Sequence, residues 1–164
     1  HEDYFQAWGA VGVLSGGTSS RLFTEVREKR GLCYGVSAAH HTLRDRAGVF
    51  CHAGTSADRA QETLDVTLGE LRRLAEGVEP DELGRLKARI KSSLIMQQES
   101  SATRSGAIAT DWYHLGRVRT VAELNGLVDG LTCESINAYL AANPPGNFTV
   151  ASVGPSPLEV PSAV

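Results

Sequence analysis

Arg27 and Tyr34 are the two side chains of this sequence whose types and spacing best suit chemistry at a peptide backbone. They stand seven residues apart, on either side of a predicted helix-to-strand corner within residues 20–36. Arginine supplies a planar fork of donors and tyrosine one further hydroxyl donor, which suits a carbonyl oxygen or a developing oxyanion. Because their separation crosses the end of a helix, both groups can converge on one spot. The corner therefore predicts a site that grips a peptide carbonyl.

The alternative role for this pair is structural. Arg27 would then pair with an acid such as Glu28 or with a tertiary partner, and Tyr34 would pack its ring and expose its hydroxyl group. Composition alone favours this alternative, and the position of the pair across a helix end favours binding.

A glycine-serine loop before the corner is a second candidate site, formed by Gly16, Gly17, Ser19 and Ser20. It leads into a helix N-terminus, where free backbone N–H groups can bind phosphate. The loop lacks the lysine of a Walker motif and the Gly-x-Gly-x-x-Gly spacing, so an inter-helix linker is the favoured role. Contact with an extended peptide is the second interpretation.

The corner is predicted to join a short helix to a β-hairpin. A serine at the end of the loop caps a helix over 20–30, and Gly31 stands where a left-handed C-terminal cap is expected. Two strands are predicted over 33–40 and 48–54. The polar link between them is short enough for a hairpin, so the strands should pair antiparallel.

Helices are predicted for most of the remaining chain. A strong one follows Ser56, with apolar residues at helical spacing, namely Leu64, Leu68, Leu71 and Ala75. Pro80 suits the first position of the next helix, whose pattern degrades over 99–106, where a break is expected before a helical run through Trp112. The other predicted elements are helices over 3–15, 121–130 and 133–142 and a final strand over 147–153.

These elements predict an α+β fold, a two-layer sandwich with an antiparallel-rich sheet and helices packed on one face. Residues 1–154 form a single domain. Its first helix follows no strand, so the opening strand of the sheet is expected upstream of residue 1. Residues 155–164 form a proline-rich tail with little reason to order itself.

Composition limits the classes of function. A chain of 164 residues suits one domain, and 16 basic against 19 acidic side chains give a net charge of −3, without the basic face that nucleic-acid binding requires. No apolar run is long enough for a membrane span. Three cysteines are an odd number, which argues against a disulfide framework. One bridge between Cys33 and Cys51 is the less favoured alternative.

No metal site is predicted. Neither His-x-x-Glu-His nor His-Glu-x-x-His occurs, and the adjacent His40 and His41 point to opposite faces of a strand, so both cannot easily serve one ion. No serine stands in a Gly-x-Ser-x-Gly motif either, so no catalytic triad is supported.

The corner and its surroundings resemble a known family. The block Ser-Arg-Leu-Phe at 20–23, followed by Glu-Val-Arg-Glu-Lys-Arg-Gly-Leu-Cys-Tyr at 25–34, resembles the C-terminal domain of the M16 zinc metallopeptidases. This is the superfamily of pitrilysin, insulin-degrading enzyme and mitochondrial processing peptidase. The resemblance extends over about residues 5–155.

The resemblance implies an α+β domain that has no zinc ligands and faces a zinc-bearing domain across a chamber. It implies that Arg27 and Tyr34 bind the substrate backbone near the scissile bond, and that this chain alone is inactive. The implied partners are an M16 N-terminal catalytic domain, in the same polypeptide or a separate subunit, and a peptide substrate. Zinc is expected in that partner domain.

Three alternatives stay open from the sequence. The chain could be a scaffold module of an M16-like protein with no part in proteolysis, or a small-molecule binding domain that uses the Gly16-Gly17 loop. A homodimer of the isolated domain is also compatible with the sequence. The compartment is left open.

Overall fold

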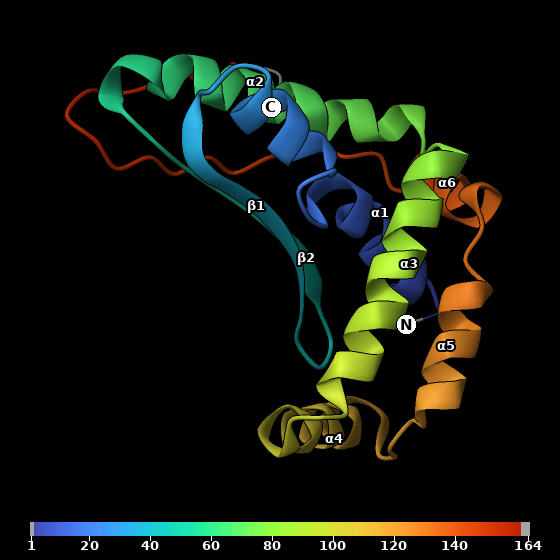
Figure 1. Ribbon diagram of the computed structural model, residues 1–164. Coiled ribbons are helices and arrows are strands. Elements are labelled where there is room, and N and C mark those ends of the chain that lie inside the picture. The colour runs from blue at the N-terminus through green and yellow to red at the C-terminus, as the bar shows by residue number, and fades with distance from the viewer. Residues whose placement is uncertain (1, 162–164) are drawn as a thin grey trace.

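The computed structural model describes residues 2–161 and consists of helices beside one long antiparallel ribbon (Figure 1). Helix α1, Tyr4–Ser15, packs against the ribbon on one side and against two later helices on the other. Its Leu14 is fully buried. Gly12 lets a later helix approach, since an added Cβ would lie 2.7 Å from Leu86 Cδ1. The prediction of an opening helix over 3–15 is confirmed.

The helix that leads to the corner is partly a π-helix. It starts as an α-turn at residues 21–22 and continues as η1, Phe23–Glu28, with hydrogen bonds that change from four-residue to five-residue spacing. Thus Thr24 N–H donates to Ser20 O at 2.9 Å, whereas Lys29 N–H donates to Thr24 O at 2.9 Å. Leu22 and Val26 are fully buried, as the apolar stripe of this helix predicts.

The predicted hairpin is confirmed and its strands are longer than expected. Strand β1, Cys33–Thr42, pairs antiparallel with β2, Ala47–Thr55. These two strands form the one sheet of residues 2–161, so the ribbon has two outer edges without a strand partner. One donor of the β1 edge is satisfied differently, because Ala38 N–H donates to Ser15 Oγ at 2.7 Å.

Helical elements make up most of the remaining chain and confirm the predicted order. The long helix after Ser56 is α2, flanked by the 3₁₀ turns η2 and η3. The break expected over 99–106 is shorter and lies at residues 98–100, because α4 already begins at Ser101. The bounds are η2 Ala57–Arg59, α2 Ala60–Arg73, η3 Leu74–Glu76, α3 Pro80–Gln97, α4 Ser101–Leu115, α5 Val121–Asp129 and α6 Cys133–Ala142.

The core lies where these helices meet α1. The largest fully buried side chains come from α1, the corner helix, α5 and α6, namely Leu14, Leu22, Val26, Val128 and Ile136. The predicted stripe of α2 needs one correction. Leu74 is buried and Ala75 is exposed, because the α-helix tightens into a 3₁₀ turn at Leu74 and the buried face shifts by one residue.

The prediction of a final strand over 147–153 is wrong. These residues have no strand assignment, and the sheet contains only β1 and β2. Alternation alone does not make a strand, which needs a neighbouring edge for its backbone groups. Here Phe148 packs partly against the core, whereas Val153 is fully exposed.

The described part of the tail, residues 155–161, lies beside α2, which differs from the expectation that the tail has no order. It runs back from α6 toward α2 (Figure 1). Gln61 brackets the backbone of Glu159, with Nε2 donating to the carbonyl oxygen at 2.9 Å and Oε1 accepting from the N–H at 2.8 Å. Residues 162–164 lie outside the described part.

Within residues 2–161, none of the helices has the length and apolar character that a bilayer span requires. Cys33, Cys51 and Cys133 are all free thiols, so the alternative of a Cys33–Cys51 bridge is not realised.

Candidate functional site

Gly31 turns the chain from η1 into β1. Its φ of +60° is left-handed, as predicted for a cap at this position. Gly31 N–H donates to Arg27 O and Leu32 N–H donates to Val26 O, both at 3.0 Å, so the last carbonyls of the helix are satisfied. Arg27 therefore stands on the last helical turn and Tyr34 on the second residue of β1.

The corner is anchored from the side of α2. Leu32 O accepts hydrogen bonds from Thr55 Oγ1 at 2.5 Å and from Thr63 Oγ1 at 3.3 Å. Arg59 Nη1 donates to Gly31 O at 3.1 Å and to the preceding carbonyl at 3.2 Å. Side chains from β2, η2 and α2 thus fix the backbone between the two candidate residues, and single-sequence reasoning gave no sign of these long-range contacts.

Both candidate side chains are accessible. Tyr34 is 82% exposed on β1, and Arg27 is exposed with its guanidinium carbon 4.9 Å from the centre of the Phe23 ring. The charge of Arg27 also reaches Cys33, the neighbour of Tyr34. Burial raises the pKa of the Cys33 thiol, and the positive charge of Arg27 partly opposes that rise.

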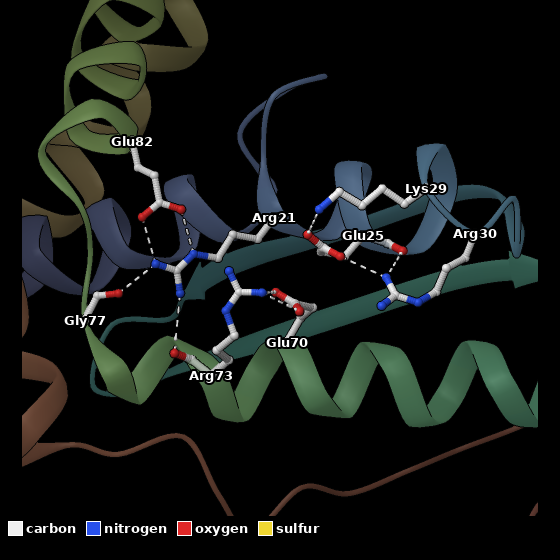
Figure 2. A network of polar contacts seen from close by, with 8 residues as sticks. All are labelled: Arg21, Glu25, Lys29, Arg30, Glu70, Arg73, Gly77 and Glu82. Carbon is white, nitrogen blue, oxygen red and sulfur yellow. Dashed lines mark hydrogen bonds and ion pairs between the residues drawn. The ribbon is translucent and has the colours of Figure 1, made fainter.

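Arg27 has no ion-pair partner among residues 2–161. Glu25, two residues before Arg27 on the same helix, is taken by two other cations, with Lys29 Nζ at 2.7 Å and Arg30 Nη1 at 2.8 Å (Figure 2). Hydrogen bonds from Lys29 and then Arg30 hold the pKa of Glu25 below its usual value. The structural alternative, in which Arg27 pairs with Glu28 or a tertiary acid, is not what the described residues adopt.

The glycine-serine loop is a separate region at the other end of the same helix. Ser20 is buried and its Oγ donates to Gly17 O at 2.6 Å, so this hydroxyl group holds the loop in shape. Gly16, Gly17 and Ser19 line a hollow of about 240 Å³ against α3. The sequence-predicted residues therefore fall into two places, the corner and the hollow.

Sequence reasoning missed the best-connected polar contact of this region, between Arg21 and Glu82. Arg21 Nε donates to Glu82 Oε1 and Nη2 to Oε2, each at 2.7 Å, and Nη2 also donates to Gly77 O at 2.7 Å (Figure 2). Arg21 belongs to the Ser-Arg-Leu-Phe block, but its partner lies 61 residues away, and a single sequence contains no signal of that pairing. Its role is to join the start of the corner helix to the start of α3.

The described residues contain no group of three or more His, Cys, Asp or Glu side chains that could hold a metal ion. The two adjacent histidines lie on opposite faces of β1, as predicted. The His40 ring lies 5.6 Å from that of Tyr4 on α1, and the His41 ring lies 5.1 Å from Phe50 on the outer face. This donor set does not fit a zinc ion.

Comparison with known proteins identifies the family of this chain. Residues 1–90 match the family model of the peptidase M16 inactive domain. An uncharacterized zinc protease of Bacillus subtilis, YmxG, is 30% identical over 159 residues, which cover 95% of this chain and 38% of the relative. An uncharacterized zinc protease of Streptomyces coelicolor is 32% identical over 135 residues, which cover 79% of this chain and 29% of the relative. The chain thus spans well under half the length of these curated relatives.

Solved structures give the same result. The peptidase M16 inactive domain of Pseudomonas fluorescens superposes with a TM-score of 0.75 at 25% identity, over 87% of this chain and 34% of that chain. A protease of Helicobacter pylori has the same fold, with a TM-score of 0.72 at 20% identity, over 85% of this chain and 34% of that chain. Family model, relatives and fold agree, and the chain belongs to the M16 peptidase family, as an inactive domain of that family.

Proposed function

We propose that this chain is the non-catalytic domain of an M16 zinc metalloendopeptidase and that it binds the backbone of a peptide substrate through Arg27 and Tyr34. It would complete the proteolytic chamber opposite a zinc-bearing N-terminal domain, in the same polypeptide or in a separate subunit. The observation that carries the proposal is an arginine without an acidic partner in the described part and a largely exposed tyrosine, held on the two sides of an anchored corner.

The chemistry of these two groups supports a role in holding a carbonyl. Neither donor is consumed by an intramolecular hydrogen bond that would have to break, so little reorganisation is required when a substrate oxygen arrives. The cap at Gly31 and the hydrogen bonds to Leu32 O fix the intervening backbone, which limits the freedom lost on binding.

Metal chemistry is not expected from this chain, because the donors within residues 2–161 do not fit zinc. When bound in the partner domain, zinc would polarise the scissile carbonyl and activate water. The residues described here would bind and orient the substrate backbone, and the isolated chain would not hydrolyse peptides.

The test is turnover of a peptide substrate by the intact enzyme that contains this chain. Arg27→Ala and Tyr34→Phe should each lower kcat/KM by about 10²–10³-fold, the usual cost of one oxyanion-type donor. Zinc content should stay unchanged. Arg44→Ala and Tyr113→Phe are matched controls at exposed positions on the hairpin loop and on α4, and they should leave turnover unchanged.

Unchanged turnover in both Arg27→Ala and Tyr34→Phe would contradict the proposal and leave the pair a structural role. A partner domain with a degenerate zinc motif and no peptidase activity would instead favour the alternative of a scaffold module.

A further inference from the structure

We infer that the hollow beside the glycine-serine loop is an anion-binding subsite, in which Arg85 and Arg89 select a carboxylate side chain of the bound peptide. The inference rests on the proposed peptide-binding function and adds to it a substrate class and two specificity-determining residues. Both arginines line the hollow together with the loop, and the hollow has a volume of about 240 Å³.

The two arginines are placed by α3. They lie four residues apart on this helix, which puts them one above the other on the same face. Arg89 crosses the loop closely, because a Cβ added to Gly16 would lie 2.7 Å from its Nη2 and one added to Gly17 would lie 3.5 Å from its Cδ. Gly16 also lies against α1, where the same Cβ would clash with Gly12 O. The Gly12 carbonyl is the contact that requires glycine at position 16, because the Arg89 guanidinium is the end of a flexible side chain and could shift.

Charge is unbalanced in the hollow. Among residues 2–161, neither Arg85 nor Arg89 has an ion-pair partner. The acid that also lines the hollow, Glu82, is neutralised by the bidentate contact with Arg21. Two positive charges thus face a space with no free counter-charge, and an anion there would gain from both.

The basic run 85–91 is divided into two roles by the fold. Its basic residues are Arg85, Lys87, Arg89 and Lys91, and the simplest interpretation of such a run is a solvated face flanked by acids. Lys87 and Lys91 fit that interpretation, since Lys87 Nζ donates to Asp129 O at 2.9 Å and Lys91 Nζ lies 2.5 Å from Asp129 Oδ1. Arg85 and Arg89 face away from that acid and toward the loop, so they do not belong to the same charge-balanced surface.

The hollow has the form of a side-chain subsite. Its lining includes the apolar residues Val13 and Leu86, and Leu86 lies against Gly12 of α1. Its volume is several times the roughly 30 Å³ that one water molecule occupies in the liquid. An acidic side chain that enters the hollow can direct its carboxylate at the guanidinium groups, which offer planar forks of donors.

The experiment measures binding of fluorescent dodecapeptides, uncharged apart from the tested residue, by the intact protein. A chelator removes zinc to prevent turnover. One glutamate is moved along the peptide, and each peptide is paired with the isosteric glutamine version. At one position the glutamate peptide should bind about three- to tenfold tighter, as expected for a partly exposed charged pair. Arg85→Glu with Arg89→Glu should remove or reverse that preference, and the milder Arg85→Gln with Arg89→Gln should remove it.

A matched control is Arg44→Glu with Arg46→Glu in the hairpin loop, which makes the same change in net charge and should keep the glutamate preference. Arg27→Ala should weaken both peptides of a pair alike, so failure of the proposed function and failure of the subsite give different results. Equal binding of every glutamate and glutamine pair, or a preference that survives Arg85→Glu with Arg89→Glu, would overturn assignment of a peptide carboxylate.

Inorganic phosphate tests whether the hollow binds a free anion and not a side chain of the peptide. Calorimetric binding of phosphate by the wild type and not by the double variant, without any glutamate preference, would support an anion site whose occupant is a free anion. Absence of both phosphate binding and glutamate preference would end the inference.

Discussion

Arg21 and Glu82 lie fork to fork, with two parallel hydrogen bonds of 2.7 Å between the guanidinium and the carboxylate. Both side chains are largely buried, at 8% and 17% exposure. The pair joins two segments that are remote in sequence, the start of the corner helix and the start of α3. The same carboxylate also accepts from Glu79 N–H at 2.9 Å and so caps α3. One pair thus sets how the loop, the corner helix and α3 lie together.

Glu82→Gln should lower the free energy of unfolding by about 3 kcal/mol, because it leaves the buried charge of Arg21 without its counter-ion. Chemical denaturation measures the effect. Glu99→Gln, at an exposed carboxylate between α3 and α4, is the control and should change stability by less than about 0.5 kcal/mol. Equal, small effects of the two substitutions would show that the pair contributes nothing to folding.

Stability should fall in acid. Burial alone would raise the pKa of Glu82, but hydrogen bonds from Arg21 and the Glu79 amide outweigh it and hold that pKa below the usual 4.5. The pKa of Asp111 is lowered chiefly by its hydrogen bond from Arg119. A carboxyl group whose pKa is lower in the folded state stabilises the fold above the unfolded pKa, and that contribution is lost as the pH falls through the folded pKa.

The Tm should therefore vary little between about pH 6 and 8 and should decline below about pH 4.5. In Glu82→Gln the acid decline should be shallower than in the wild type, since one of the titrating groups is gone. Scanning calorimetry over this pH range provides the measurement, and a decline of identical slope in both proteins would argue against a contribution from Glu82.

Gly31→Ala should destabilise the chain by about 1–2 kcal/mol, because its φ of +60° is left-handed and costs an L-residue that amount. Space is not the reason, since an added Cβ would meet nothing closer than Arg59 Nη1 at 3.8 Å. Gly69→Ala is the matched control. It lies in α2 with no heavy atom within 4 Å of the added Cβ, and it should stabilise the helix by about 0.5–1 kcal/mol. Thermal unfolding of both variants should give shifts of opposite sign.

Helix α4 should open more readily than the rest of the chain. Of its 15 residues only Asp111 is buried, and the carboxylate of that residue accepts from Arg119 N–H at 2.9 Å and from Arg119 Nη2 at 2.5 Å. Few buried apolar contacts give a segment a low opening free energy. Asp111→Asn should raise amide exchange of α4 by about tenfold, corresponding to roughly 1.4 kcal/mol, and leave α3 unchanged.

Hydrogen–deuterium exchange followed by mass spectrometry measures this difference segment by segment. Asp45→Asn, in the exposed hairpin loop, is the control and should change neither helix. Protection of α4 equal to that of α3 in the wild type would mean that α4 is held by more than its contact with Arg119.

Reducing agent should have no effect on the Tm. Cys51 pairs with Ala38, five residues along β1 from Cys33, so the two cysteines are separated by about 17 Å at the strand rise of about 3.3 Å per residue. A disulfide needs Cα atoms within about 7 Å. Titration of the unfolded chain with a thiol reagent should give three thiols, as all three cysteines are free, and two missing thiols would contradict the ribbon register.

The sequence was most informative where one residue determines local geometry. Gly31 predicted a left-handed cap and Pro80 predicted a first helical position, and both are confirmed. The strand pair was predicted correctly because β-forming residues flank a short polar link. The family itself was predicted from the block around Arg27 and Tyr34, a local pattern.

The failures arise where geometry depends on distant partners. Residues 147–153 alternate like a strand but find no edge to pair with, and the tail lies beside α2 because Gln61 binds its backbone. The π-helical spacing that ends in Lys29 N–H donating to Thr24 O leaves no mark on apolar periodicity over six residues. Arg21 and Glu82 come together only through the packing of the corner helix against α3, and a single sequence does not reveal this packing.

The ribbon of β1 and β2 has a consequence for handling the molecule in solution. A sheet of two strands has two exposed edges of backbone donors and acceptors, and a strand of another chain can pair with such an edge. These edges belong to the folded state, so stabilising the fold does not remove them. We therefore expect crowding of properly folded molecules, and not denaturation, to set the highest concentration at which this chain stays dispersed.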